Sequence, residues 1–292
     1  MNRIKGILYA AVSSSTFGLA PFFSITLLLA GFSAFEVLSY RWGVASIVLI
    51  VFGWLSGCNF RLAGKDWGVV FLLSLLRAVT SFSLIIAYQN IASGVASTIH
   101  FMYPLAVALA MMFFFREKKS LLVILAVLMS LLGAALLSLG ELEAKSGNTM
   151  VGLVAACVSV FSYAGYIVGV RTTRAVQINS TALTCYVMGL GTIFYLIGAY
   201  CTSGLQLVSD GYTWLIILGL ALPATAISNI TLVQAIRYAG PTLTPILGAM
   251  EPLTAVVIGV FVFKELFTVN SAVGIILILL AVSIVVFRRQ KS

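Results

Sequence analysis

Two stretches of the chain repeat the same pattern. His100 to Glu117 reads HFMYPLAVALAMMFFFRE, and Gly248 to Glu265 reads GAMEPLTAVVIGVFVFKE. Each places a proline early in a long apolar run and a glutamate thirteen residues later, and Pro104 and Pro252 stand 148 positions apart. The same offset lays the segment AYQNIASGVAS over AIRYAGPTLTP. Because an internal repeat fixes an architecture before any single motif is read, the chain is expected to consist of two similar halves.

The chain is too apolar for a soluble domain. Its residues are 61% hydrophobic and 9% charged, whereas soluble domains have roughly 45–50% and about 25%. Apolar segments of about 20 residues recur along the whole length, each able to cross a hydrocarbon core of roughly 30 Å as a helix. The short alternating segments of a membrane barrel do not dominate. The predicted fold class is therefore an all-α integral membrane protein.

Apolar runs between polar breaks predict ten transmembrane helices. The first is interpreted as a span rather than a signal peptide, because its run is long enough to cross the bilayer and resembles the start of the second half. Five spans per half is an odd number, so the second half must cross the membrane in the opposite sense. We therefore expect two inverted five-helix repeats, at residues 1–140 and 149–292, with a substrate near the midplane between them. The predicted spans are 5–28, 35–56, 67–88, 92–115, 120–139, 149–170, 179–201, 212–236, 241–263 and 269–287.

The basic residues indicate the orientation. The net charge of +9 comes from lysines and arginines at the ends of apolar runs, which is typical of topology signals rather than of a nucleic-acid site. If the N-terminus is cytoplasmic, the lysines and arginines at the ends of the spans all fall on the cytoplasmic side except Lys145 and Lys264. We expect both termini to be cytoplasmic in a multi-pass protein of the plasma (cell inner) membrane.

A few polar side chains inside the spans are the candidate binding residues. An ionisable group at membrane depth is costly and is a functional candidate by default. Helical spacing places hydroxyl groups and tyrosines on the same faces, so these stripes are expected to line one central cavity. The candidate substrate-binding residues are Arg41, Arg77, His100, Tyr103, Tyr163, Tyr166 and Glu251.

Structural explanations of the same residues stay open. Arg77 and Glu251 could form a buried ion pair that locks the two halves together without any ligand. His100 could be a hydrogen-bonded packing residue, and hydroxyl groups in membrane helices often bond their neighbours.

Prolines inside spans are candidate gating elements. A proline frees a carbonyl one turn back and kinks the helix, which can expose polar backbone toward a cavity. Pro104, Pro245 and Pro252 lie inside predicted spans, and the first and last occupy equivalent positions in the repeats.

Signatures of soluble enzymes are missing from the sequence. There is no P-loop, HExxH, GxSxG or GxGxxG motif in the required context. A single histidine excludes a multi-histidine metal site, and the four cysteines have no CxxC spacing. We expect no catalytic residues, no cofactor and no metal.

The two repeated segments resemble a known family. AYQNIASGVASTIHFMYPLAVALAMMFFFRE and AIRYAGPTLTPILGAMEPLTAVVIGVFVFKE are similar to the fourth-to-fifth span pattern of the ten-helix EamA family in the drug/metabolite transporter superfamily. Arg41 resembles the arginine common in that family's second span. The resemblance implies transport of small metabolites, commonly export of amino acids, through a cavity open alternately to each side. The acidic-proline signature occurs once, because Tyr103 stands where the second repeat has Glu251, and Arg77 and His100 are outside the family pattern.

The leading hypothesis is a transporter, secondary-active or facilitative, that exports a small polar or zwitterionic metabolite by alternating access. The arginines would hold an acidic group, the tyrosines would offer aromatic contact, and Glu251 would pair with an amine or take part in proton coupling. The expected partners are a small-molecule substrate, the lipid bilayer and either a proton or a counter-substrate, with no nucleic acid. The alternatives are import instead of export, a transporter of small organic or phosphorylated anions, an intramembrane enzyme and a non-transporting membrane subunit.

Overall fold

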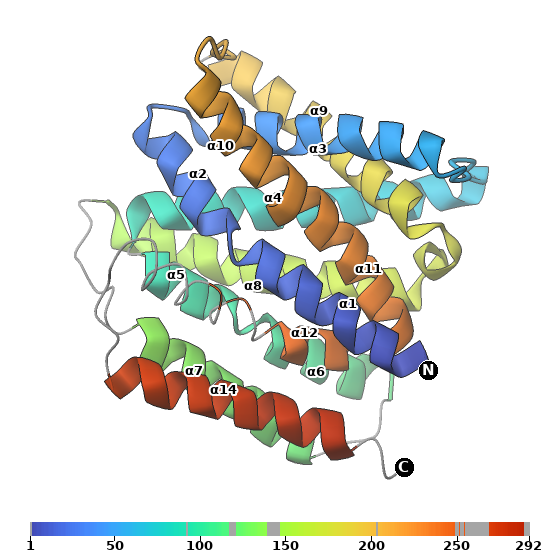
Figure 1. The fold of residues 1–292 in the computed structure, drawn as a ribbon, viewed down its shortest axis with the longest axis vertical. Coiled ribbons are helices and arrows are strands. Elements are labelled where there is room, and N and C mark those ends of the chain that lie inside the picture. The colour runs from blue at the N-terminus through green and yellow to red at the C-terminus, as the bar shows by residue number, and fades with distance from the viewer. Residues whose placement is uncertain are drawn as a thin grey trace.

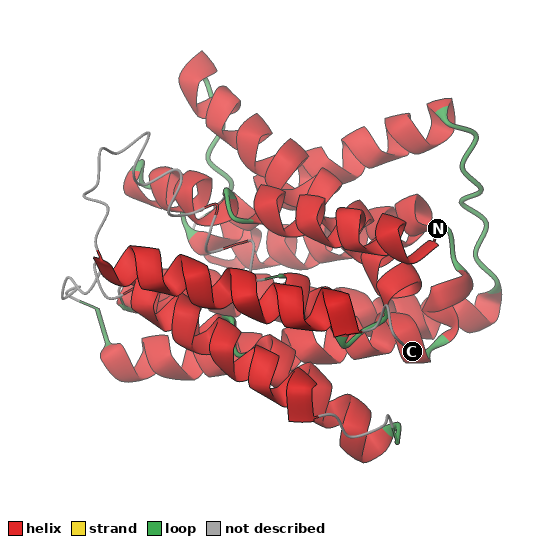
Figure 2. Cartoon of the chain, turned by 60° about the horizontal axis from the view of Figure 1, so that its bottom comes forward, coloured by secondary structure: helices red, strands yellow, loops and turns green. Residues whose placement is uncertain are grey.

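A computed structural model of the chain describes residues 2–91, 93–116, 121–138, 147–202, 204–248, 251, 254 and 269–288. All regular structure within these ranges is helical (Figures 1 and 2). Six helices, some built of adjoining segments, are long and apolar enough to cross a membrane, and shorter apolar helices accompany them. The prediction of a helical membrane protein is confirmed.

The first part of the chain supplies nine helical segments. They are α1 (Asn2–Phe17), α2 (Ala20–Leu29), α3 (Ala34–Leu55), the short 3-10 helix η1 (Gly64–Asp66), α4 (Trp67–Asn90), α5 (Ser93–His100), α6 (Tyr103–Phe114), α7 (Leu121–Ser138) and, after residue 147, α8 (Thr149–Thr172).

The remaining segments continue from η3 (Arg174–Gln177) to the C-terminal helix. They are α9 (Ser180–Thr202), α10 (Gly211–Ala221), the π-helical turn η4 (Leu222–Ile227), α11 (Ser228–Ala239), α12 (Leu243–Leu247) and α14 (Val269–Arg288).

Four helix pairs have the most extensive contacts, and each joins a helix before residue 140 to a helix after residue 147. They are α4 with α8, α1 with α11, α3 with α9, and α7 with α14. Small residues bring the backbones close together at these crossings. A side chain on Gly191 of α9 would overlap the Trp42 ring of α3, and one on Gly133 of α7 would approach the Gly274 carbonyl of α14 at 2.7 Å. Close approach at small residues is the usual way membrane helices associate without a hydrophobic driving force.

Prolines interrupt two of the expected spans. Pro21 stands in the first turn of α2, and Pro104 in the first turn of α6. In both places the chain leaves the helix for two residues and then begins a new one, which suits a proline that has no N–H to donate to the preceding turn. The second break comes directly after His100, so Pro104 starts a separate segment, α6, rather than bending a continuous helix. Pro245 lies buried inside α12, and Pro252 lies outside the described residues.

A π-helical turn connects α10 to α11. It contains Pro223, and the backbone N–H of Ser228 bonds the Pro223 carbonyl five residues back. The Thr225 hydroxyl donates to the Leu220 carbonyl at 2.7 Å. Such turns rotate the residues that follow them relative to an α-helical register and are frequent at functional sites. Here the turn directs Thr225 and Asn229 toward the centre of the helix bundle.

Candidate functional site

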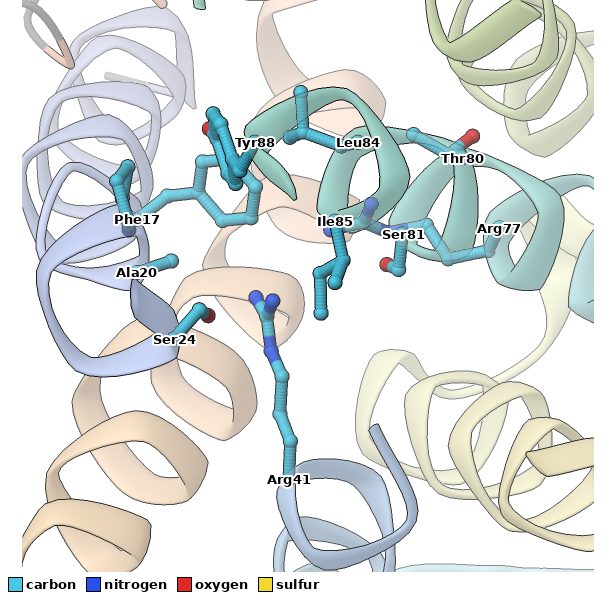
Figure 3. A pocket seen from close by; sticks show the side chains of 11 residues that line it. Phe17, Ala20, Ser24, Arg41, Arg77, Thr80, Ser81, Leu84, Ile85 and Tyr88 are labelled. Atoms are coloured by element: carbon cyan, nitrogen blue, oxygen red, sulfur yellow. The ribbon is translucent and has the colours of Figure 1, made fainter. Parts of the chain in front are cut away.

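Two buried arginines line a narrow cavity between α1, α2, α3 and α4. The cavity is small, with a volume of about 10 Å³ for the centre of a water molecule. That is about the room one water needs, so the cavity is constricted. Figure 3 shows the Arg41 and Arg77 side chains reaching into it from different helices. Its walls are Phe17, Ala20, Pro21, Ser24, Arg41, Arg77, Thr80, Ser81, Leu84, Ile85 and Tyr88.

Arg41 comes from α3 and is held by the π-helical turn. Its Nε donates to the Thr225 hydroxyl at 2.6 Å, and its Nη2 reaches the Ala224 carbonyl at 3.5 Å. The Arg41 guanidinium also lies 5.7 Å from the centroid of the Phe17 ring. Both acceptors belong to the π-helical turn, so this turn positions the hydrogen-bond partners of Arg41.

Arg77 comes from the middle of α4 and is 1% exposed. Its Nε donates to Asn229 Oδ1 at 3.1 Å, and the Asn229 amide in turn donates to the Thr225 carbonyl at 2.7 Å. The Arg77 guanidinium lies 4.8 Å from the Tyr163 ring centroid, 5.5 Å from that of Phe17 and 5.9 Å from that of Tyr166. The face of an aromatic ring attracts the guanidinium cation, and the N–H groups of the guanidinium stay free to form hydrogen bonds in its own plane.

Arg77 keeps an unused donor. Among the described residues, its buried Nη1 has no hydrogen-bond partner. Leaving a buried donor unbonded costs about 1–3 kcal/mol, and more when the group is charged. A guanidinium fork with a free N–H at a cavity is suited to the carboxylate or phosphate oxygen of a bound molecule.

The ion pair between Arg77 and Glu251, which the sequence left open, is not formed: among the described residues no carboxylate lies within 4.0 Å of either guanidinium. Glu251 is nevertheless close enough to interact electrostatically with both Arg77 and Arg41. The groups that accept hydrogen bonds from the two arginines, on Thr225, Ala224 and Asn229, are therefore neutral. Two cations against one anion leave the site with an excess of positive charge.

An aromatic cluster adjoins the arginines. The Tyr163 ring, which contacts Arg77, also stacks on the His100 ring at 5.3 Å and meets the Tyr103 ring edge-on at 4.6 Å. Tyr166 stacks on Tyr163 at 6.4 Å. This cluster connects the end of α5 and the start of α6 to α8.

The segment that follows α12 approaches the cluster closely. A side chain on Gly248 would overlap the Tyr103 hydroxyl, and a side chain on Gly18 would stand 2.7 Å from the Glu251 carbonyl. Glycine at position 18 therefore lets the backbones of the two halves meet beside the site, and glycine at position 248 leaves room for the Tyr103 side chain.

The structure brings the predicted candidates together. Arg41 and Arg77 line one cavity, the three tyrosines and His100 form the adjoining cluster, and Glu251 lies within electrostatic reach of both arginines. Thr225 and Asn229, which hold the two guanidiniums, were not among the predicted residues. Pro223 in the same apolar run is the sequence signal that could have drawn attention to them.

The fold and this buried, charged cavity define a multi-pass helical membrane protein of transporter type. A sequence model of the EamA-like transporter family matches residues 4–139 and again residues 150–287, so the chain belongs to that family. Membership of the drug/metabolite transporter superfamily follows, and the resemblance seen in the sequence is confirmed.

Two further comparisons agree with the family. An uncharacterized transporter of Archaeoglobus fulgidus is 28% identical over 238 residues, which cover 80% of this chain and 83% of the relative. A solved crystal structure shares the fold with a TM-score of 0.80 at 18% identity, covering 100% of this chain and 99% of that one. Family and relative indicate a membrane transporter rather than an enzyme.

Proposed function

We infer that the protein exports a small zwitterionic, amino-acid-like metabolite across the plasma membrane by alternating access, as a secondary-active or facilitative transporter. The unused Nη1 of Arg77 at the cavity carries this proposal. Arg77, assisted by Arg41, binds the carboxylate of the solute. Tyr103, Tyr163, Tyr166 and His100 form the aromatic side of the site.

Ten spans in two inverted repeats are the architecture that we propose for this mechanism. Two of the most extensive pairings, α4 with α8 and α1 with α11, correspond to spans three with six and one with eight, which an axis relating the halves would exchange. The other two, α3 with α9 and α7 with α14, join equivalent spans of the two halves. This pattern is what pseudo-twofold symmetry produces.

The orientation we propose places both termini in the cytoplasm. The beginning of α1 and the end of α14 lie at the same end of the helix bundle in Figures 1 and 2. At that end Arg237 donates to the Ser180 hydroxyl at 2.8 Å and to the Ile178 carbonyl, next to the basic η3 turn. Basic residues gathered at one end support a cytoplasmic position.

Pro104, Pro245 and Pro252 are the proposed gating elements. Pro104 lies in the first turn of α6, directly after Tyr103 of the aromatic cluster. Because proline has no N–H, the His100 carbonyl four residues back receives no hydrogen bond from it. Because the helix is already interrupted here, α5 and α6 can change their relative angle at this joint.

Counterflow in proteoliposomes tests the proposal. Proteoliposomes that contain the wild-type protein are loaded with an unlabelled solute and then given labelled amino acids, nucleosides, sugars or organic anions. Exchange of an amino acid supports the zwitterion. Exchange of none of the solutes by folded protein contradicts transport of these classes.

Glu251→Gln distinguishes two roles of the carboxylate in the same assay. If Glu251 pairs with the amine of the solute, the variant loses exchange itself. If it carries a coupled proton, the variant still exchanges solute but no longer accumulates it against a gradient when a pH difference is imposed.

An organic or phosphorylated anion is the second candidate solute. The observation in its favour is the charge balance of the site, which sets Arg41 and Arg77 against Glu251 alone. Exchange of pyruvate, succinate or glycerol phosphate, with no exchange of amino acids, would favour this candidate over the zwitterion.

A further inference from the structure

His100 is the one histidine in the chain and ends helix α5. Its side chain is 2% exposed. The imidazole packs against Tyr163 at 5.3 Å and Tyr103 at 5.4 Å between ring centroids. Tyr163 is also the ring closest to the Arg77 guanidinium. His100 is therefore one aromatic ring away from the unused Arg77 donor.

The hydrogen bonds around Ser159 fix the tautomer of His100. Ser159 Oγ lies 2.6 Å from the Ala156 carbonyl, which can only accept, so the one hydroxyl proton of Ser159 is committed there. His100 Nδ1 lies 2.9 Å from the same Oγ. Since the hydroxyl has no second proton, Nδ1 must be the donor in this bond.

The other ring nitrogen is then an acceptor. A neutral imidazole protonated at Nδ1 carries a lone pair on Nε2. A doubly protonated ring would place a further cation in the low-dielectric cluster that already holds Arg77, which is costly. His100 Nε2 is buried and, among the described residues, has no hydrogen-bond partner.

We propose that His100 is held as the Nδ1–H tautomer by Ser159 so that Nε2 accepts a hydrogen bond from the transported solute. This inference rests on the proposed transport function and deepens it. The site then has two poles: the Arg77 fork takes an anionic group, and His100 Nε2 takes a donor group, an ammonium or a hydroxyl. Solutes that carry both groups are preferred over analogues that lack the donor.

The second repeat has no equivalent of this acceptor. The position that corresponds to His100 is Gly248, where a side chain would overlap the Tyr103 hydroxyl. The acceptor therefore belongs to the first repeat alone and gives the site a direction, which fixes how an asymmetric solute lies in it.

Nitrogen-15 NMR of the single histidine tests the tautomer without any assignment of other residues. The full chain is labelled at histidine and purified through a tag that contains none. We expect Nδ1 to resonate as a protonated nitrogen and Nε2 as an unprotonated one at neutral pH. A protonated Nε2, in either the other tautomer or the imidazolium, overturns the inference.

Two substitutions separate the acceptor role from a packing role. In His100→Asn the side-chain amide can still donate to Ser159 but offers nothing at the Nε2 position. In His100→Gln the amide oxygen reaches the Nε2 position, and the bond to Ser159 is lost. We expect Gln to keep the preference for donor-bearing solutes and Asn to lose it by about tenfold, the weight of one hydrogen bond.

Counterflow with matched pairs of solutes measures that preference. The pairs are alanine and propionate, phenylalanine and 3-phenylpropionate, and serine and alanine. The first two pairs test an ammonium donor and the third tests a hydroxyl donor. An Asn variant with wild-type preference, or a Gln variant that loses preference while Asn keeps it, overturns the inference. A wild-type protein that exchanges none of these solutes contradicts the proposed function and with it the role of His100, whereas exchange with a protonated Nε2 contradicts the role of His100 alone.

Discussion

The two halves of the molecule contribute different chemistry to the same site. The first half supplies both guanidiniums, Arg41 and Arg77. The second supplies the neutral groups that hold them, Thr225 and Asn229. The aromatic contacts are shared more evenly, because Phe17 and Tyr163 occupy equivalent positions after Gly6 and Gly152, 146 residues apart, and both face Arg77.

This difference shows what a duplicated fold can gain by diverging. The helix pairings keep the same pattern in both halves, since it depends on small residues and apolar faces. The charged and hydrogen-bonding residues do not repeat: the cavity is lined by residues of the first half, from Phe17 to Tyr88, and the second half supplies the groups that hold its two arginines. Each prediction below separates the contribution of one half from that of the other.

The largest effect on exchange is expected at Asn229, where a residue of the second half accepts a hydrogen bond from Arg77 of the first half. Asn229→Leu removes the acceptor of Arg77 Nε and leaves a buried cation less well bonded. A hydrogen bond to a charged group is worth about 1.5–3 kcal/mol, so exchange should fall by about 10- to 100-fold. Counterflow measures this loss.

Thr231→Val is the matched control for that substitution. Thr231 lies on the same helix, is partly buried, and bonds backbone carbonyls of its own chain segment, Ile227 at 2.7 Å among them. It should leave exchange unchanged. Equal losses in both variants would mean that α11 is merely destabilised and that the bond to Arg77 is unimportant.

The next effect concerns the contact between the halves at Gly18. Gly18→Ala places a methyl group 2.7 Å from the Glu251 carbonyl, so backbone must move. Overpacking of this kind costs about 1–3 kcal/mol, and the thermal midpoint in detergent should fall by several degrees. Gly189→Ala in α9, with no atom within 4 Å of the added methyl group, should leave the midpoint unchanged or raise it. A Gly18 variant as stable as the Gly189 variant would show that this contact is loose.

A smaller effect separates the two equivalent aromatic residues. Tyr163→Leu and Phe17→Leu each remove one ring from the Arg77 guanidinium, which is worth about 0.5–2 kcal/mol. The shorter distance at Tyr163, 4.8 Å against 5.5 Å, predicts the larger loss of exchange there. If Phe17→Leu reduces exchange more than Tyr163→Leu does, the first half contributes more of the aromatic contact to Arg77 than the two distances indicate.

The smallest effect is expected at a helix start in the second half. Thr213 donates its backbone N–H to the Asp210 carboxylate at 2.7 Å, and this bond, with one from its hydroxyl, holds the pKa of Asp210 below its usual value. The stabilisation is therefore complete above the pKa of an unfolded aspartate and is lost as the pH falls through the lowered pKa of the folded protein.

Asp210→Asn keeps a good capping residue but removes this pH dependence. Because the carboxylate is exposed, the difference in thermal midpoint should stay below about 2 °C. Midpoints measured from pH 7 to pH 3 should converge for the two proteins at the acid end. A gap that widens toward low pH would contradict the assignment.

The sequence was sufficient for the helical membrane fold and for singling out the two buried arginines that line the cavity. Arg41 and Arg77 stand out because a charge inside an apolar run is costly. The repeat indicated that Pro104 marks a special point in its span. Helical spacing also placed Tyr163 on a polar face, and the structure finds its ring beside Arg77.

The sequence was not sufficient for the groups that hold those charges. Thr225 and Asn229 are neutral, and such residues in membrane helices usually bond their own helix. Their direction depends on the π-helical turn at Pro223, which shifts the residues after it out of the 3.6-residue register that spacing arguments assume. For the same reason the sequence offered Glu251 as an open alternative partner of Arg77, whereas in the structure Arg77 bonds the Asn229 amide oxygen.

The most direct measurement of the central claim, that Arg77 binds the transported solute, is counterflow by Arg77→Ala beside Arg171→Ala. Arg171 is an exposed arginine at the end of α8 and serves as the matched control. Losing a buried partner of a charged group costs about 2–5 kcal/mol, so Arg77→Ala should exchange solute at least about 30-fold more slowly while eluting as wild-type folded protein. Wild-type exchange by the folded Arg77→Ala protein would contradict the claim.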